Sequence, residues 1–378
     1  MKKKFLLTPG PTPVPEEVLL TQAAPIIHHR TKEASEIIMS ATEDLKKVFK
    51  TKNDVLTLTS SGTGGMEGAI ANTLKEGDKV IAIACGKFGE RWVEISRAYR
   101  LNVVVIDREW GDYPDPEDIK KELDKNPDAK AVLSTLCETS TATLGCIKEI
   151  GELLKDRDTL HIVDAISGLG GDNIEVDNWH VDICVAGSQK GLMLPPGLAF
   201  VTMSEKAWRF TEQSNLPKYY FDFKAYKKSL GKSTTPYTPA ITLIIGLRKA
   251  LDLILKEGID NVLHRNAVMA EATRKAVKAL GLELLSKKPA NTVTAIKAPQ
   301  GVDGAEWKNL LAKKYGMNVA GGQAQLKGKI IRIAHLGYID PFDILAVISA
   351  IEMSLKELGY PVKIGEGIKS AEEVLSTL

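Results

Sequence analysis

Cysteine is scarce in this sequence: there are four among 378 residues, and no two of them form a CxxC pair. We therefore expect neither a disulfide framework nor a structural zinc site. An excess of one charge is absent as well, because 50 Lys and Arg stand against 48 Asp and Glu, a net charge of +2. Nucleic-acid-binding proteins usually carry a basic excess. The sequence thus predicts no nucleic-acid partner and no metal.

Long apolar runs are also missing. After the lysines at positions 2–4, the apolar run covers only residues 5–7, which is too short for a secretory signal peptide. No segment approaches the ~18 apolar residues that cross a membrane as a helix. Together with the low cysteine content, this predicts a cytoplasmic protein without a membrane partner.

The composition is that of an ordinary globular protein, with 44% hydrophobic and 26% charged residues. At about 150 residues per domain, this length indicates two or three domains. Four prolines within the first fifteen residues keep that segment extended. We predict an extended N-terminal arm at 1–15, a large domain at 16–257 and a small C-terminal domain at 258–378.

Short apolar runs alternate with amphipathic segments through the large domain. We expect strands at 55–59, 80–84, 103–106, 131–135, 160–163 and 181–186, and helices at 32–48, 66–74, 89–99, 116–123 and 239–257. This alternation predicts an α/β fold whose mostly parallel sheet is covered by helices. For the small α/β domain we expect helices at 262–280 and 341–358 and strands at 282–285, 293–296 and 329–333.

A glycine-rich segment, Ser60-Ser61-Gly62-Thr63-Gly64-Gly65, separates a predicted strand from a predicted helix. The free N–H groups at a helix N-terminus attract an anion such as a phosphate. The spacing fits no dinucleotide fingerprint, because Glu67 stands where the third glycine would be, and no Walker A loop is present. The segment therefore predicts a phosphate site without a nucleotide, with an ordinary turn as the alternative.

Two further residues stand at the ends of apolar runs. Asp164 follows the run at 160–163, and Lys190 follows the run at 181–186. Ligands of α/β proteins bind at the carboxyl ends of strands. Taken alone, these residues could be a helix cap and a solvated lysine. Together with a phosphate cradle they are what pyridoxal phosphate needs: an acid for the ring nitrogen and an amine for the aldehyde.

At this point a resemblance becomes specific. From about residue 5 to 360 the chain resembles the class V aminotransferases of fold type I, in the alanine–glyoxylate and serine–pyruvate group. The matching segments are Thr8-Pro9-Gly10-Pro11-Thr12, Ser61-Gly62-Thr63-Gly64, Glu138-Thr139-Ser140-Thr141, Val163-Asp164-Ala165, Gly187-Ser188-Gln189-Lys190-Gly191, Thr235-Pro236-Tyr237-Thr238-Pro239 and Ile331-Arg332-Ile333.

The resemblance implies a role for each matching residue. Lys190 would bind the pyridoxal phosphate aldehyde covalently and move the substrate proton, and Asp164 would pair with the ring nitrogen. Phe88 would stack on the ring, where many relatives carry tryptophan, and Thr139 would bond near its phenolic oxygen. Arg332 would bind the substrate α-carboxylate through its planar fork; an exposed arginine paired with an acid is the alternative.

The resemblance also implies how the phosphate is held. The residues that would surround the phosphate within one subunit are Gly62, Thr63, Gly64 and Gln189. Thr235 and Thr238 would reach the phosphate of a neighbouring subunit, so the site would be shared within a homodimer. Some relatives have histidine at the position of Thr63, which suggests that its backbone N–H is the group used.

The function implied is a ping-pong aminotransferase that moves an amino group from alanine or serine to glyoxylate or pyruvate. One alternative is a cysteine desulfurase or other lyase, although those relatives carry histidine where this chain has Gln189, and the last cysteine, Cys184, lies in a predicted strand. Another is a pyridoxal-phosphate-binding subunit of a larger complex. His28 and His29 receive no role, while Arg30 is the candidate cation for a dicarboxylic substrate.

Overall fold

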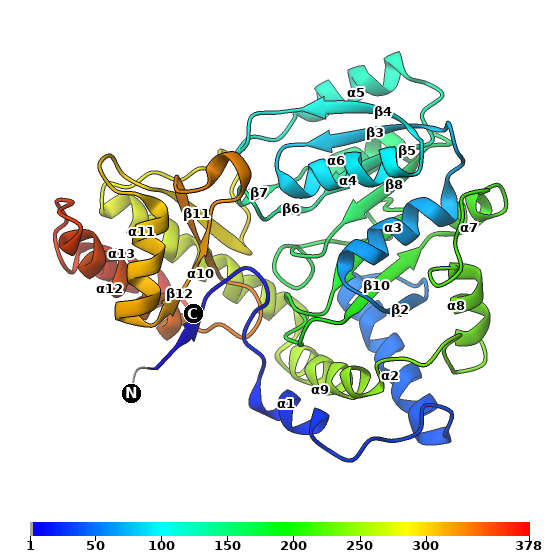
Figure 1. Ribbon diagram of the computed structural model, residues 1–378, viewed down its shortest axis with the longest axis horizontal. Coiled ribbons are helices and arrows are strands. Elements are labelled where there is room, and N and C mark those ends of the chain that lie inside the picture. The colour runs from blue at the N-terminus through cyan, green and yellow to red at the C-terminus, as the bar shows by residue number, and fades with distance from the viewer. Residues whose placement is uncertain (1–2) are drawn as a thin grey trace.

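The computed structural model describes residues 3–378 (Figure 1). Its main feature is a seven-stranded sheet in the order β2-β10-β9-β8-β5-β3-β4. The strands are β2 (Val55–Thr59), β3 (Lys79–Ala84), β4 (Asn102–Asp107), β5 (Ala131–Thr135), β8 (Leu160–Asp164), β9 (Ile183–Gly187) and β10 (Leu198–Met203). Only β10 runs antiparallel to its neighbours. The predicted α/β fold with a mostly parallel sheet is confirmed.

Helices accompany this sheet along the chain: α1 (Glu16–Gln22), α2 (Lys32–Phe49), α3 (Gly62–Thr73), α4 (Lys87–Ala98), α5 (Pro116–Lys125), α6 (Ile147–Leu154), α7 (Glu205–Thr211), α8 (Phe223–Leu230) and α9 (Ile241–Glu257). Every residue of β5, β8 and β9 is buried, which explains why their sequences are continuously apolar rather than alternating. Helix α3 approaches the sheet closely at Gly65, where a Cβ would lie 2.7 Å from Val185.

The chain from residue 258 onward forms a second assembly, coloured yellow to red beside the large sheet in Figure 1. Its elements are α10 (Ile259–Ala279), β11 (Val293–Lys297), α11 (Gly304–Leu310), a π-helical turn (Leu311–Tyr315), β12 (Met317–Asn318), β13 (Ala320–Gly321), a 3₁₀ turn (Ala324–Leu326), β14 (Ile330–Ala334), α12 (Pro341–Glu357) and α13 (Glu366–Leu375). Strands β11, β14 and β13 form an antiparallel sheet, and this part has its own apolar core. The exact domain boundaries remain a prediction.

The N-terminal segment lies with this second assembly, although it is far from it in sequence. Strand β1 (Phe5–Leu6) pairs in parallel with β12. Directly after it, the carbonyl of Leu7 accepts a hydrogen bond from the Ala334 amide at 2.9 Å. A short hairpin of β6 (Cys137–Glu138) and β7 (Thr143–Leu144) completes the strands. The N-terminal residues are therefore held by backbone hydrogen bonds to β12 and to the end of β14.

Some expected elements differ from the structure. The predicted strand at 282–285 is wrong. The segment makes an isolated bridge between Leu284 and Ile296, with two backbone hydrogen bonds to β11, and then turns away, so that the Lys287 amide donates to the Gly111 carbonyl. The helix expected at 66–74 begins four residues earlier, at Gly62. The sequence predicts neither strand β10 nor the helices α6, α7, α8, α11 and α13. Within residues 3–378 no helix is long and apolar enough to cross a membrane.

Candidate active site

The predicted site residues of the large sheet lie at the carboxyl ends of its strands. Asp164 is the last residue of β8, Lys190 follows β9 by three residues, and the glycine-rich turn follows β2. Parallel strands end at one edge of a sheet, so these three segments meet there. This is the arrangement that the order of strand and helix predicts.

Lys190 is buried, with 9% of its surface exposed. Its Nζ donates a hydrogen bond to the Pro9 carbonyl at 2.7 Å. Burial is the largest cause that lowers the pKa of Lys190 to about 8; the positive charges of Arg332 and Arg91 act in the same direction, and Asp164 opposes them. A lysine with this pKa is neutral in a useful fraction of molecules near pH 7, as a nucleophilic amine must be.

The N-terminal arm forms one wall around this lysine. At Gly10 the φ angle is +143°, and an added Cβ would overlap the Lys190 side chain. The Thr12 hydroxyl donates to the Lys190 carbonyl at 3.0 Å, and its amide donates to the Gln189 carbonyl at 3.1 Å. Pro9, Gly10 and Thr12 carry no individual role in the predictions from sequence. The signal was present, because they belong to a segment that carries the family resemblance.

Asp164 is 3% exposed. Its Oδ1 accepts a hydrogen bond from the Ile166 amide at 2.8 Å. Burial raises the pKa of Asp164 to about 7, with the Ile166 bond and the charge of Arg91 opposing it. No cation among residues 3–378 forms an ion pair with it. A buried carboxylate in this state would be stabilised by an N–H donor, such as a protonated ring nitrogen.

The start of α3 offers free backbone donors. Its N-cap residue, Ser61, makes no capping hydrogen bond with its side chain. The Gly64 amide is bonded to the Ser61 carbonyl at 3.0 Å, whereas the amides of Gly62 and Thr63 have no partner in the part of the chain that the structure describes. Next to Lys190, the buried Oε1 of Gln189 also lacks a partner. Free amides at a helix N-terminus suit a phosphate.

Phe88 is held by a residue that sequence analysis left without a role, Glu138. This carboxylate is fully buried, and its Oε2 accepts from the amides of Phe88 (3.0 Å) and Gly89 (2.9 Å). Its Oε1 accepts from the amide (3.2 Å) and hydroxyl (2.5 Å) of Ser140. Burial raises the pKa of Glu138, and these hydrogen bonds oppose the rise. The carboxylate thereby fixes the first turn of α4.

Arg332 lies in β14 and is 5% exposed. Its Nε and Nη2 donate to the Gly321 carbonyl (3.0 and 2.8 Å), and its Nη1 donates to the Thr139 carbonyl (2.8 Å). Two of its five N–H groups therefore remain free. Burial lowers the pKa of Arg332 to about 10, against the charge of Glu138. The alternative of an exposed arginine paired with an acid is wrong, since no carboxylate within residues 3–378 forms an ion pair with it.

Thr139 provides more than the carbonyl that binds Arg332. It is buried, and its hydroxyl donates to the Ser167 hydroxyl at 2.7 Å. Thr139 follows directly after Glu138, so one short segment contacts both the arginine and the first turn of α4. The structure thus brings Lys190, Asp164, Gly62, Thr63, Gly64, Phe88, Thr139, Gln189 and Arg332 to one region.

Thr235 and Thr238 are not brought to this region. The Thr235 hydroxyl donates to the Tyr237 carbonyl at 2.7 Å, and Thr238 is exposed. Arg30 binds the same loop: its Nη1 donates to the Thr235 carbonyl at 2.7 Å and to the Thr234 hydroxyl. No contact joins this loop to Lys190 within the described chain. A role at the phosphate would require a second subunit and stays a prediction.

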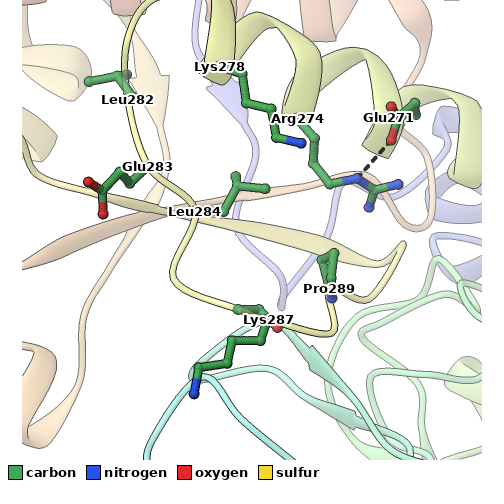
Figure 2. A pocket seen from close by; sticks show the side chains of 9 residues that line it. Glu271, Arg274, Lys278, Leu282, Glu283, Leu284, Lys287 and Pro289 are labelled. Atoms are coloured by element: carbon green, nitrogen blue, oxygen red, sulfur yellow. Dashed lines mark hydrogen bonds and ion pairs between the residues drawn. The ribbon is translucent and has the colours of Figure 1, made fainter.

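A groove of about 630 Å³ lies elsewhere, between α10 and the segment 282–289 (Figure 2). Figure 2 shows the Arg274 side chain turned towards Glu271 of the same helix, to which it is bound at 3.1 Å. None of the predicted site residues lines this groove. The groove is therefore not part of the site.

The residues at the sheet edge fit pyridoxal phosphate. Lys190 offers a buried amine of lowered pKa, and Asp164 offers a buried carboxyl without an internal cation. The free amides of α3 and the unpartnered amide oxygen of Gln189 mark a place for a polar group that the protein itself does not fill. Among residues 3–378 no cluster of His, Cys, Asp and Glu suited to a metal ion is found.

Comparison with known proteins agrees with this chemistry. Residues 5–335 match the family model "Aminotransferase class-V". An uncharacterized aminotransferase of Methanocaldococcus jannaschii is 48% identical over 99% of this chain and 98% of its own. A soluble hydrogenase small subunit of Synechococcus is 43% identical over 99% of both chains. The serine–glyoxylate aminotransferase of Methylorubrum extorquens is 39% identical over 99% of this chain and 96% of its own.

Among solved structures, the ureidoglycine–glyoxylate aminotransferase of Bacillus subtilis superposes with a TM-score of 0.95. The two sequences are 30% identical, and the match covers 100% of this chain and 99% of the other. The similarity therefore includes the small antiparallel assembly as well as the large sheet.

Proposed function

This chain belongs to the class V aminotransferases, a pyridoxal-phosphate-dependent family, and we propose that it moves the amino group of alanine or serine to glyoxylate or pyruvate by a ping-pong mechanism. The observation that carries the substrate class is Arg332. It is a buried guanidinium with two free N–H groups and no carboxylate partner among residues 3–378. A ligand with a carboxylate would complete its hydrogen bonding.

The amino donor and the 2-oxo acid acceptor share an α-carboxylate, so one arginine can serve both half-reactions. Charge-assisted hydrogen bonds contribute about 1.5–3 kcal/mol each. The bonds to Gly321 and Thr139 fix the guanidinium before the substrate arrives. We propose that Arg332 binds this carboxylate and thereby orients the substrate Cα towards Lys190.

A small substrate side chain is favoured by the state of Arg30. A dicarboxylic substrate needs a second cation, and Arg30 is the candidate. In the structure its guanidinium is bound to the loop of Thr234 and Thr235. This engagement supports alanine or serine over an acidic amino acid.

Pyridoxal phosphate, when bound, supplies an aldehyde that accepts the amino group and a ring that withdraws electrons from the substrate Cα. We propose that Lys190 binds that aldehyde and that its Nζ then moves the proton at Cα. Asp164 would keep the ring nitrogen protonated, and Phe88 would lie against the ring, where stacking contributes about 0.5–1.5 kcal/mol. Gly62, Thr63, Gly64 and Gln189 would hold the phosphate, and Thr139 would bond near the phenolic oxygen.

We further propose a homodimer, with Thr235 and Thr238 completing the phosphate site of the partner. Large apolar side chains on the surface support it, since Leu20, Ile26 and Tyr219 are 71%, 73% and 79% exposed. Exposed apolar side chains that gather into one patch often mark a protein–protein interface. The four unpaired cysteines support a cytoplasmic location.

A cysteine desulfurase needs a reactive thiolate, and the chain offers poor candidates. Cys85, Cys137 and Cys184 are buried, and burial raises the pKa of Cys146 to about 12. Thiols in this state are not nucleophiles at neutral pH. The second candidate function is that of a subunit in a larger complex, and its support is the similarity to the Synechococcus hydrogenase subunit.

The test combines a substrate panel with a covalent label. Alanine, serine, aspartate and cysteine are offered with glyoxylate, pyruvate or 2-oxoglutarate, and products are quantified. We expect the pairs of alanine or serine with glyoxylate or pyruvate to have a kcat/KM at least about 10-fold higher than any pair with 2-oxoglutarate. The second carboxylate of 2-oxoglutarate would have no cation partner in the site, and a missing ion pair costs at least that much. Borohydride reduction of the holoprotein should attach the cofactor at Lys190.

The possible outcomes separate the alternatives. A label on another residue would refute the role of Lys190. Release of sulfide from cysteine would identify a desulfurase instead. A labelled protein that turns over no pair, but co-purifies with a stoichiometric partner, would identify a subunit of a complex.

A further inference from the structure

Arg91 bridges the first turns of the two helices that border the site. It lies in α4, and its Nη1 donates a hydrogen bond to the Thr63 hydroxyl in α3 at 3.2 Å. Its guanidinium also lies over the Phe88 ring, 4.9 Å from the ring centroid. One side chain thus contacts two predicted cofactor-binding residues, one of the phosphate group and one of the ring.

This guanidinium lacks a counter-ion. Its bond to Thr63 uses one of five N–H groups, and no other partner for it is found within residues 3–378. Lys87, one turn earlier in α4, is paired with Glu90 at 3.2 Å and with Glu94 at 3.0 Å. The helix therefore neutralises Lys87 and leaves the half-buried Arg91 without an ion pair. An unpaired half-buried cation is favourable where an anion binds.

The charge of Arg91 acts inside the site. Burial raises the pKa of Asp164 and lowers the pKa of Lys190, and in both groups the charge of Arg91 shifts the pKa downward. The guanidinium is therefore close enough to influence both residues that would contact the cofactor. Thr63, whose hydroxyl accepts the hydrogen bond of Arg91, lies in the first turn of α3. The amides of that turn without a hydrogen-bond partner are the ones that suit a phosphate.

On the basis of the proposed function, we propose that Arg91 is a binding residue for the cofactor phosphate. Its guanidinium supplies the full positive charge that the neutral amides of Gly62 and Thr63 lack. Its contacts with the Thr63 hydroxyl and the Phe88 ring hold it at that end of the site. Sequence analysis did not select Arg91, because an arginine in an amphipathic helix is usually solvated.

The test compares pyridoxal phosphate with pyridoxal, which lacks only the phosphate. Full-length protein is freed of cofactor, and both compounds are titrated into the wild type and into the Arg91→Met and Arg91→Lys variants. Because charge-assisted hydrogen bonds contribute about 1.5–3 kcal/mol, Arg91→Met should weaken pyridoxal phosphate binding about 10- to 100-fold. Pyridoxal binding should weaken no more than about 3-fold, and Arg91→Lys should recover most of the loss because it keeps the charge.

The matched control is Arg97→Met, the same change at an exposed position of the same helix, which should alter neither affinity. The proposal is overturned if Arg91→Met binds pyridoxal phosphate as tightly as the wild type, or if both affinities fall equally. Should Arg91→Met not fold, Arg91→Gln against Arg91→Lys makes the same comparison. A wild-type protein that binds no pyridoxal phosphate would refute the proposed function, whereas failure of the Arg91 comparison alone refutes only this inference.

Discussion

The carboxyl edge of the large sheet and the assembly after residue 258 contribute to the site in different ways. The edge supplies Lys190, Asp164 and the start of α3, each at the end of a strand or within three residues of it. The second assembly supplies Arg332, from the middle of an antiparallel sheet. In a parallel sheet the strand ends indicate where chemistry occurs. An antiparallel sheet has no such edge, so its contribution depends on individual side-chain contacts.

The two regions also differ in what they would do. The buried amine and carboxyl of the large sheet have pKa values moved towards neutrality, as groups that handle protons require. Arg332 keeps its charge and offers two N–H groups. We therefore expect damage at the sheet edge to affect the chemistry, and damage in the second assembly to affect substrate binding.

The strongest test of this division is Arg332→Lys. Lysine keeps the positive charge but lacks the planar guanidinium group. It cannot donate to the carbonyls of Gly321 and Thr139 and at the same time form a bidentate pair with a carboxylate. We expect KM for alanine to rise about 100-fold, with the affinity for pyridoxal phosphate unchanged. Steady-state kinetics and cofactor titration measure the two quantities.

Arg274→Lys is the control for that experiment. It makes the same change in the same assembly, but at an arginine outside the site that is paired with Glu271. It should leave KM within about 2-fold of the wild type. An unchanged KM in Arg332→Lys would show that another group binds the carboxylate. A loss of affinity for pyridoxal phosphate in Arg332→Lys would show that the second assembly also contributes to cofactor binding, contrary to the proposed division.

A smaller effect is expected at the junction of the two regions, from Gly10→Ala. The new Cβ would overlap the Lys190 side chain, and the φ angle of +143° disfavours any side chain. We expect kcat to fall about 10-fold, because a small displacement of a reacting group costs this much or more. Transamination rates at saturating substrate provide the measurement.

Gly77→Ala is the control that distinguishes the effect of backbone strain from the effect of the overlap with Lys190. Gly77 also has a positive φ, +84°, but no atom lies within 4 Å of the place that a Cβ would take. The variant should lose stability by about 1 kcal/mol while keeping its kcat. If both variants lost kcat equally, the arm would have no specific effect on Lys190.

The smallest effect concerns the pH dependence of stability. Burial raises the pKa of Asp164 from 3.8 to about 7, so between these values the folded protein binds more protons than the unfolded chain. The free energy of unfolding of the cofactor-free protein should therefore fall as the pH rises from about 4 to about 7, by up to about 1.4 kcal/mol per pH unit from this group.

Asp164→Asn removes this contribution. Urea unfolding of both proteins at several pH values measures the difference between them. Burial also raises the pKa of Glu138 and of Asp172, and both groups are present in both proteins, so their contributions cancel. The variant should show a shallower decline than the wild type over that range. Parallel curves would mean that Asp164 is not desolvated as the structure indicates.

The sequence predicted the large sheet well because its strands are buried on both faces and read as apolar runs. It failed at 282–285, where the same apolar signal comes from Leu282 and Leu284 packing against the core. The backbone there makes two hydrogen bonds with β11 and then turns away, which is too little for a strand. Strand β10 was missed because it follows its neighbour after a short loop with prolines rather than after a helix.

For the site, local signals identified Lys190, Asp164 and the glycine-rich turn. Arg332 depended on the family resemblance, since nothing in the pattern of β14 distinguishes it from an exposed arginine. Glu138, Pro9 and Arg91 were not given roles because their contacts join segments far apart in sequence. The bonds of Glu138 to α4 span about fifty residues, and that of Pro9 to Lys190 spans 181.

The N-terminal arm has a mechanical consequence. Leu7 is bonded to Ala334 at the end of β14, and Pro9, two residues later, is bonded to the Lys190 amine. Two residues of extended chain span at most about 7 Å, so the contact with Ala334 and the contact with Lys190 lie at nearly a fixed separation along the arm. A rotation of the small sheet that carries Arg332 therefore pulls on the reactive amine through the same tether, and the two ends of the substrate site cannot drift apart independently.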